Sequence, residues 1–248
     1  MSVSDAGQWA DALEAALRAA AVPERAAGEK AYLKSDLDFL GASVPAIRRV
    51  VKAFAREHPG LGRGSVGDLV DALWAAPIHE RRMAAVEILS AYAALLEPED
   101  LERIEQFLRQ AKTWALVDNL AAIVVGGLVE RFPELTPVMD RWADDDDFWL
   151  RRSALLSHLL PLRSGRGDFR RFGQYADAML DEKEFFIRKA IGWVLRETGK
   201  QRPDLVYDWL APRTHRASGV TVREAVKQLP PDRAEELLTA YREKRPAM

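Results

Sequence analysis

A helical segment recurs along the chain with a period of about 35 residues, and this period limits the possible folds more than any other feature. Six segments align, and the steps between their anchors are 36, 37, 33, 37 and 35 residues. The anchors are Val44, Glu80, Val117, Leu150, Ile187 and Val222. A second helical stretch precedes most of these segments, whereas alternating strand-like patterns are almost absent. Two helices in each period are typical of a HEAT-like α-solenoid; a non-repetitive helical bundle is the alternative.

The expected fold is therefore all-α, a right-handed α-solenoid of about six HEAT-like helix pairs. We expect a single domain over residues 1–248, with an N-terminal capping helix within 1–30 and a frayed tail at 240–248. A chain of this length can bury a substantial core in one such array. The second helix of each pair lines the concave side of a solenoid, so the outward faces of these helices should converge on one groove.

The composition excludes several classes of protein. The sequence contains no cysteine, which excludes disulfides, thiolate metal sites and a cysteine nucleophile. It shows no signal peptide and no long uncharged apolar run, so we expect no membrane contact and a bacterial-type cytosolic location. The four histidines lack HExxH spacing, and the chain has neither a Gly-rich phosphate loop nor a GxSxG elbow.

One carboxylate stands alone in an otherwise uncharged helical stretch. Between Lys112 and Glu130 the single charged side chain is Asp118. A helix this apolar should be buried, and a carboxylate on it is costly unless another group pairs with it or uses it. Trp114 lies four residues earlier, so the indole and the carboxylate share one face of the helix.

The segment of the fifth repeat has two contrasting faces. At about 100° per residue, Ile187, Ile191, Val194 and Leu195 cluster on one side of the helix. The other side carries Lys189, Trp193 and Arg196. This second face is either a tryptophan packed on a neighbouring repeat between extended basic side chains, or an aromatic and cationic surface for a ligand.

The segment of the fourth repeat carries two adjacent arginines. On the helical wheel Arg152 lies beside Leu156 and Leu159, while Arg151 points in the same direction as His158. An arginine on an apolar flank needs an acidic partner or a phosphate. The periodicity does not choose between the two arginines.

Charge is distributed unevenly along the chain. The net charge is −2, which by itself argues against a nucleic-acid binder. Residues 148–227, however, hold 16 Lys and Arg against nine Asp and Glu, so the remainder carries a net −9. This asymmetry permits a basic surface on an acidic protein.

Two charged runs have simpler explanations. The acidic run 144–147 lacks the spacing of a metal loop, and capping of the following helix explains it better, so no metal site is expected. Arg163, Arg166, Arg170 and Arg171, with glycines between them, have the composition of a flexible basic linker. These arginines either contact DNA phosphates or are solvated, and we favour the first.

Several motifs together resemble the DNA alkylation repair family, the AlkD-like alkylpurine DNA glycosylases. They are FLGASVPAIRR (39–49), KTWALVDNLA (112–121), FWLRRSALL (148–156), EFFIRKAIGWVLRE (184–197) and VREAVKQL (222–229). The resemblance extends from about Tyr32 to about Leu229, and the fourth motif is the most specific. It implies HEAT-like repeats around double-stranded DNA and removal of cationic N3- and N7-alkylpurines without a metal or organic cofactor.

The resemblance also implies roles for individual residues. Asp118 matches the catalytic carboxylate, and Trp114 and Trp193 match tryptophans that flank the deoxyribose of the lesion. Arg152 matches an arginine that contacts the lesion strand, and Tyr32 matches an aromatic residue near the same cleft. Further DNA contacts are expected from basic side chains of the later repeats: Arg151, Arg163, Arg166, Lys189, Arg196, Arg223 and Lys227.

The chemistry of such a substrate agrees with a single carboxylate. The alkylated purine already carries positive charge, so its glycosidic bond breaks without protonation of the base. The enzyme has to stabilise the oxocarbenium-like sugar and hold a water, and Asp118 could do both. The expected protein is a monomer with no obligate protein partner, associated with the nucleoid when bound to DNA. The alternatives are a non-catalytic HEAT-repeat scaffold and a DNA-structure-binding protein.

Overall fold

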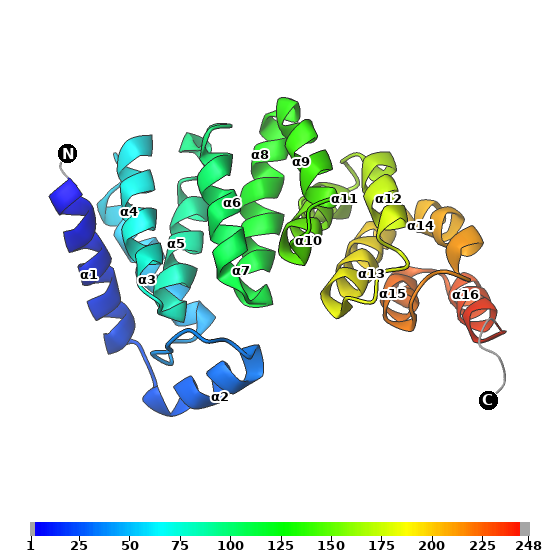
Figure 1. Ribbon diagram of the computed structural model, residues 1–248, viewed down its shortest axis with the longest axis horizontal. Helices are drawn as coiled ribbons and strands as arrows, with labels where there is room; N and C mark the ends of the chain where they lie inside the picture. The colour runs from blue at the N-terminus through cyan, green and yellow to red at the C-terminus, as the bar shows by residue number, and fades with distance from the viewer. Residues whose placement is uncertain (1–2, 244–248) are drawn as a thin grey trace. The chain divides into compact units, whose positions relative to one another are not determined.

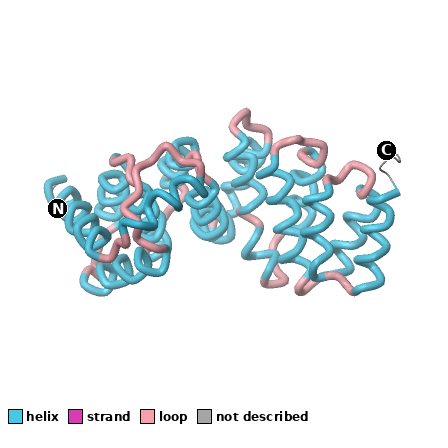
Figure 2. Tube along the Cα trace, turned by 90° about the horizontal axis from the view of Figure 1, so that it is seen from below, coloured by secondary structure: helices cyan, strands magenta, loops and turns pink. Residues whose placement is uncertain are grey.

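The computed structural model describes residues 3–243, and it divides the chain into two compact units, Met1–Leu120 and Ala121–Met248. Helices joined by loops make up the described part of both units (Figure 2). Within it, strand-like pairing is limited to a single bridge between Asp38 and Ile78. The predicted all-α fold is confirmed.

Within the residues that the structure describes, unit 1 has seven α-helices, and Figure 1 labels them. They are α1 (Val3–Ala19), α2 (Pro23–Leu33), α3 (Val44–Glu57), α4 (Arg63–Ala75), α5 (His79–Ala91), α6 (Asp100–Ala111) and α7 (Trp114–Asn119), with a 3₁₀ turn at Ala93–Leu95. Helix α5 packs against α3, α4 and α7, and α1 packs against α3 and α4. The core between them consists of fully buried aliphatic side chains such as Leu17, Ile47, Leu73 and Ile88.

Local sequence sets the helix ends of unit 1. Ser43 caps α3 by accepting a hydrogen bond from the backbone N–H of Ala46, and Lys112 ends α6 in the left-handed conformation at φ 48°. The loop between α2 and α3 is held by Glu80, which is fully buried. Its carboxylate accepts backbone hydrogen bonds from residues 40, 41 and 42 at 2.7–3.2 Å. A loop without regular structure is thereby fixed against α5.

In its described part, up to Glu243, unit 2 contains nine α-helices. They are α8 (Gly126–Arg131), α9 (Thr136–Ala143), α10 (Phe148–Leu156), α11 (Leu159–Arg163), α12 (Phe169–Ala178), α13 (Phe185–Gly199), α14 (Pro203–Leu210), α15 (Gly219–Ala225) and α16 (Pro231–Glu243). Short 3₁₀ turns lie at Pro133–Leu135, Ala211–Arg213 and Val226–Gln228. A π-helical segment, Leu120–Val125, joins α7 to α8, and the division between the units falls at its first residue.

Helix α13 is central to unit 2, where it packs against α10, α11, α14 and α15. The approach to α15 is close, because a Cβ atom added at Gly192 would lie 2.7 Å from the Cβ of Glu224 and 3.0 Å from the carbonyl oxygen of Thr221. The glycine in the EFFIRKAIGWVLRE motif therefore has a packing role. Trp142 and Phe172 are the largest fully buried side chains of this unit.

All six repeat segments are mainly helical, although a turn at residues 157–158 interrupts the fourth. The helices expected before them at 66–74, 134–142, 172–180 and 204–210 correspond to α4, α9, α12 and α14. The capping segment 1–30 differs from expectation, because Val22 is extended and Pro23 starts a second helix there. Helix α16 continues to Glu243, so residues 240–243 are helical; the rest of the expected tail, 244–248, lies outside the described residues. The single domain over 1–248 stays a prediction.

Candidate functional site

Helix α7 of unit 1 carries the candidate carboxylate. The extended residue Thr113 precedes this helix of six residues, and Leu116 and Val117 anchor it in the core. Trp114 and Asp118 are both half-buried. The structure therefore corrects the expectation of a buried carboxylate. Asp118 also interacts with another group of the protein, so its charge is not isolated.

An aromatic pair lies beside this helix. The rings of Trp114 and Tyr32 meet edge to face, with centroids 5.9 Å apart and planes at 87°. Tyr32 is 73% exposed, although it is a large aromatic residue. The structure thus brings together two of the residues predicted from the sequence, and their role in binding DNA stays a prediction.

A cavity of about 230 Å³ opens beside the aromatic pair within unit 1. Its walls include Ile47, Met83 and Asn119 together with the two rings. Asn119 donates to the carbonyl oxygen of Ala115 at 3.3 Å and lies 3.7 Å from the sulfur of Met83. Asp118 is not among the lining residues, so the carboxylate lies on the same helix as this cavity but outside it.

His79 also lines this cavity, although no motif in the sequence points to it. Its ring stacks on Phe39 with centroids 4.6 Å apart, and burial lowers its pKa to about 4, so the imidazole is neutral at pH 7. The Nδ1 atom of His79 is buried with no hydrogen-bond partner among the described residues. His79 lies 35 residues before Trp114, one period of the repeat, and this register is the signal that could have revealed it.

The helical wheel of the fifth repeat predicts the two faces of α13 in unit 2. Its four apolar residues, Ile187, Ile191, Val194 and Leu195, are fully buried. Lys189 is exposed, and Trp193 and Arg196 are half-buried. The wheel did not single out Phe185, which is 51% exposed, with its ring centroid 5.8 Å from the Nζ atom of Lys189. The spacing in the sequence could have indicated this contact, because Phe185 lies four residues before Lys189 and residues four apart are neighbours on a helix.

The two arginines of α10 are both engaged within unit 2. Arg151 forms a bidentate pair with Glu182 at 3.0 Å and also donates to the carbonyl oxygens of Asp145 and Asp146. The guanidinium of Arg152, which is 2% exposed, donates to the carbonyl oxygen of Phe186 and lies 5.7 Å from the centroid of its ring. A contact of Arg152 with a DNA strand stays a prediction, and it requires the guanidinium to leave Phe186.

Most of the other predicted DNA-binding cations have acidic partners in unit 2. Arg163 pairs with Glu197 at 3.3 Å and Arg166 with Glu130 at 2.8 Å. Arg196 and Lys227 share Glu224. Burial acts to raise the pKa of Glu224, but the hydrogen bond from Lys227 and the charge of Arg196 outweigh it and lower the pKa below its usual range.

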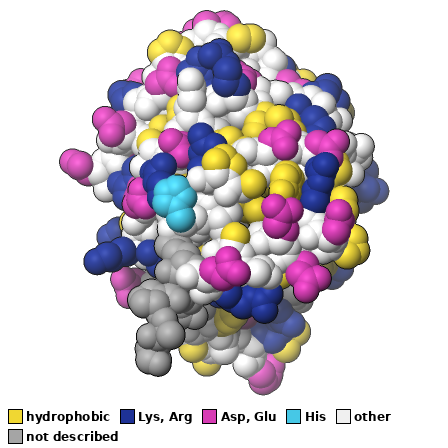
Figure 3. All heavy atoms as spheres, turned by 90° about the vertical axis from the view of Figure 1, so that its right-hand side faces the viewer, with side chains coloured by type: hydrophobic (Ala, Val, Ile, Leu, Met, Phe, Trp, Pro, Cys, Tyr) yellow, Lys and Arg dark blue, Asp and Glu magenta, His cyan; other side chains and the backbone are white. Residues whose placement is uncertain are grey.

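The expected basic linker is largely helical. Arg163 ends α11, Arg170 and Arg171 belong to α12, and only residues 164–168 form a loop. Gly165 and Gly167 turn this loop with φ of 77°. The end of unit 2 nearest the C-terminus shows acidic and basic side chains interspersed (Figure 3). The surplus of positive charge in the sequence therefore does not form a uniformly basic face there.

The acidic run 144–147 acts as predicted. The carboxylate of Asp147 accepts a hydrogen bond from the backbone N–H of Trp149 at 2.9 Å and so caps α10. The described residues hold no group of three or more His, Asp or Glu that could ligate a metal. Among the same residues, every helix is too short or too polar to cross a lipid bilayer.

Comparisons with known proteins bear on the fold and the family of the chain. No curated protein matches the sequence. A solved structure named as a predicted DNA alkylation repair enzyme from Enterococcus faecalis shares 24% sequence identity with a TM-score of 0.77, over 85% of this chain and 97% of that one. The structure of AlkD2 from Streptococcus mutans shares 16% identity with a TM-score of 0.60, over 82% of this chain and 98% of that one. At these identities the likeness shows a shared fold.

The family follows from the sequence itself. Residues 13–229 match the profile of the DNA alkylation repair enzymes, and this range includes Tyr32, Trp114, Asp118, Arg152 and Trp193. The match covers most of the chain. The protein belongs to the DNA alkylation repair enzyme family.

Proposed function

We propose that the protein is a DNA glycosylase that removes cationic N3- and N7-alkylated purines from duplex DNA and leaves an abasic site. One observation carries the proposal: α7 presents an indole and a carboxylate, both half-buried, one helical turn apart. The Trp114 ring also meets the exposed ring of Tyr32. A carboxylate beside aromatic faces suits a substrate that gains positive charge on its sugar.

The proposed reaction needs no proton donor for the leaving base. The bond between C1′ and the purine nitrogen breaks, and its electron pair leaves with the base, which thereby loses its positive charge. The sugar becomes an oxocarbenium-like cation, which the carboxylate of Asp118 stabilises. A water then forms the new C1′–O bond and passes its proton to Asp118 and on to solvent. No cofactor is required.

DNA binding is proposed to depend on phosphate contacts from unit 2. Lys189 and Arg223 are exposed cations of this unit, and Phe185 lies beside Lys189. The cations that already pair with Glu130, Glu197 or Glu224 would have to share or break those ion pairs to bind a phosphate. We therefore propose that Lys189 and Arg223 contact DNA phosphates without the loss of such an ion pair.

A DNA-structure-binding protein without chemistry is the second candidate. The burial of Arg152 favours it, because an arginine held against Phe186 does not reach a lesion strand without rearrangement. In that case the protein would bind DNA and release no base.

The test uses Asp118→Asn, which keeps the shape of the side chain and removes its charge. Release of 7-methylguanine from methylated duplex DNA, measured by chromatography, should fall by about 10²–10³-fold, as when one electrostatic stabiliser of a transition state is lost. Affinity for duplex DNA, measured by fluorescence anisotropy, should change little. The matched control is Asp68→Asn, the same substitution at an exposed position of α4 in the same unit.

The outcomes separate the two candidates. Release by Asp118→Asn at the wild-type rate refutes the assigned role of the carboxylate. Absence of any released purine from the wild-type protein, together with measurable DNA binding, rejects the glycosylase and supports the non-catalytic binder.

A further inference from the structure

One carboxylate of α15 interacts with cations on both sides of Trp193. Lys189 lies four residues before Trp193 and Arg196 three residues after it, so these side chains share one face of α13, which we call the Trp193 face. The guanidinium of Arg196 donates a hydrogen bond to Oε2 of Glu224, and the charge of Lys189 also acts on that carboxylate. Lys227 donates to the other oxygen, Oε1, at 2.6 Å. Glu224 is therefore a shared acidic partner of the cations at the Trp193 face.

Helix packing fixes the place of Glu224. A Cβ atom added at Gly192 would lie 2.7 Å from the Cβ of Glu224, so α15 lies directly against α13 at the residue before Trp193. The hydroxyl of Thr221 donates to the carbonyl oxygen of Arg188 at 3.0 Å and ties the start of α15 to the same helix. The carboxylate is thus held beside the Trp193 face by the packing of two helices as well as by its ion pairs.

Positive charge exceeds negative charge around Glu224. Lys189, Arg196 and Lys227 are three cations for one carboxylate, which leaves a net charge of +2. A second carboxylate, Glu197, lies 3.4 Å from Arg196, but it has two further cationic partners of its own. A surface with this surplus attracts anions, and the anions that DNA presents are its backbone phosphates.

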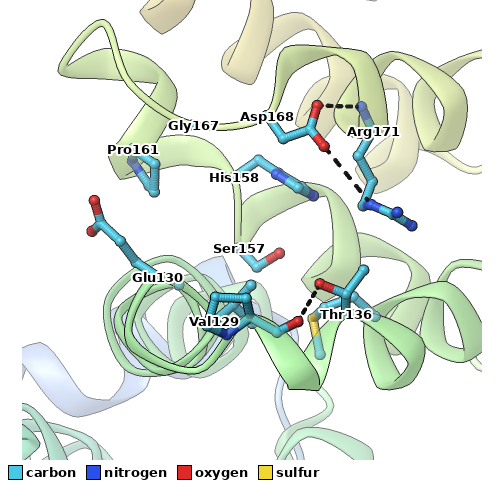
Figure 4. Close-up of a pocket in the computed structure, with 12 residues that line it drawn as sticks. Val129, Glu130, Thr136, Ser157, His158, Pro161, Gly167, Asp168 and Arg171 are labelled. Atoms are coloured by element: carbon cyan, nitrogen blue, oxygen red, sulfur yellow. Dashed lines mark hydrogen bonds and ion pairs between the residues drawn. The ribbon is translucent and has the colours of Figure 1, made fainter.

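The cavity of unit 2 drawn in Figure 4 has the opposite balance of charge. Its charged lining residues are Glu130, Asp168 and Arg171, and in Figure 4 the carboxylate of Asp168 faces Arg171. His158 adds no charge to this lining at pH 7, because burial lowers the pKa of its imidazole to about 4. Two carboxylates for one guanidinium make the lining acidic, so a DNA phosphate is attracted to the Trp193 face instead.

We propose that Glu224 is a specificity-determining residue, whose carboxylate takes the place of a DNA phosphate on Arg196 and Lys227. A phosphate of the duplex has to compete with this carboxylate for the two cations. Because phosphates are the same at every base pair, the competition lowers the affinity for undamaged duplex and shortens the time that the protein spends on it. Partly exposed ion pairs are weak, so Glu224 reduces the affinity without preventing binding. The inference rests on the proposed binding of duplex DNA by unit 2.

The experiment compares the full chain with its Glu224→Gln variant on an undamaged, fluorescein-labelled duplex, by fluorescence anisotropy at about 50–200 mM salt. Glutamine keeps the shape of the side chain and can still accept from Arg196 and Lys227, but it lacks the charge. The matched control is Glu105→Gln on α6 of unit 1. The Glu105 side chain is 16% exposed, against 17% for Glu224, and it pairs with Arg109 at 2.8 Å. Both variants raise the net charge of the chain by one, so a difference between them reports the position of the charge.

Glu224→Gln should bind the undamaged duplex about tenfold more tightly at about 50 mM salt, because one more phosphate is neutralised. For the same reason, the slope of log K against log salt concentration should become steeper by about 0.9. Glu105→Gln should change the affinity less than about twofold. With undamaged duplex in excess, release of 7-methylguanine by Glu224→Gln should be several-fold slower than release by the wild type, because more of the variant is held on undamaged DNA.

Weaker binding by Glu224→Gln overturns the inference, because the carboxylate would then position Arg196 and Lys227 for DNA instead of competing with it. Unchanged affinity and salt slope, or an equal gain in Glu105→Gln, overturn it as well. The glycosylase proposal fails on a different result: a wild type that binds duplex and releases no purine rejects the chemistry, while the affinities of the variants still test Glu224. A wild type that does not bind duplex overturns both.

Discussion

Replacing Glu80 with alanine should lower the free energy of unfolding of unit 1 by about 3–5 kcal/mol. The fully buried carboxylate accepts backbone hydrogen bonds from Leu40, Gly41 and Ala42 at 3.0, 2.7 and 3.2 Å. A hydrogen bond to a charged group contributes about 1.5–3 kcal/mol, and three backbone donors, two of them on buried residues, would lose their acceptor together. Neighbouring contributions are not additive, so the total stays below the sum of three such bonds.

The geometry also predicts a smaller effect for Glu80→Gln. Oε1 accepts from all three N–H groups and Oε2 accepts only from Leu40, so an amide oxygen at the Oε1 position keeps most of the arrangement. We expect a loss of about 1–2 kcal/mol for this variant. The control is Glu87→Ala on the same helix, which removes an ion pair with the half-exposed Arg48 and should cost less than about 1 kcal/mol.

The assay combines urea unfolding with hydrogen exchange, because two compact units need not unfold together. In Glu80→Ala the amides of residues 40–42 should lose protection, while the amide of Trp142 in the core of unit 2 keeps it. A loss of stability below about 1 kcal/mol, or unchanged protection of those three amides, would refute the role assigned to Glu80.

Three further predictions follow from the packing. Burial lowers the pKa of His79 to about 4, so the unfolded chain takes up the proton first as the pH falls, and the free energy of unfolding drops by up to about 3 kcal/mol between pH 6.5 and pH 4. In His79→Leu, urea unfolding should show a weaker dependence of this free energy on pH, and the part that remains belongs to His158, whose pKa is lowered in the same way. An unchanged pH dependence in His79→Leu contradicts the assignment. Gly192→Ala should lower the melting temperature by several degrees, because its Cβ would meet the Cβ of Glu224 at 2.7 Å; unchanged melting contradicts that close approach. Asp147→Ala should cost about 1 kcal/mol of cap energy by urea unfolding, with Asp147→Asn as the capping-competent control, and equal losses would exclude the cap.

The sequence predicts those parts of the molecule that follow from periodicity. The apolar stripe of α13 is an example, because Ile187 and Ile191 lie on one side of an ordinary α-helix and are both fully buried. The cap at Asp147 is another, because capping depends on a side chain and a backbone N–H only two residues away. In both cases the interaction that decides the structure is local.

Long-range partners could not be predicted in the same way. Arg152 lies against Phe186, 34 residues later, and nothing in the wheel of α10 indicates which carbonyl oxygen would receive its guanidinium. Glu80 reaches backbone groups 38 to 40 residues earlier, in a loop without regular periodicity. Such contacts depend on how neighbouring repeats pack, and a pattern within one repeat does not contain that information.

The π-helical segment after α7 explains why the burial of Asp118 was overestimated. The sequence predicts one uniformly buried helix from Lys112 to Glu130, but a π turn at Leu120–Val125 interrupts it and changes its phase. Five of the six residues of that segment are buried, whereas Trp114, Asp118 and Asn119 on α7 are half-buried. The apolar residues from which burial of the carboxylate is predicted therefore belong mostly to the π-helical segment Leu120–Val125. What distinguishes Asp118 is consequently its place one turn from an indole, next to a π turn of the kind that recurs at functional sites.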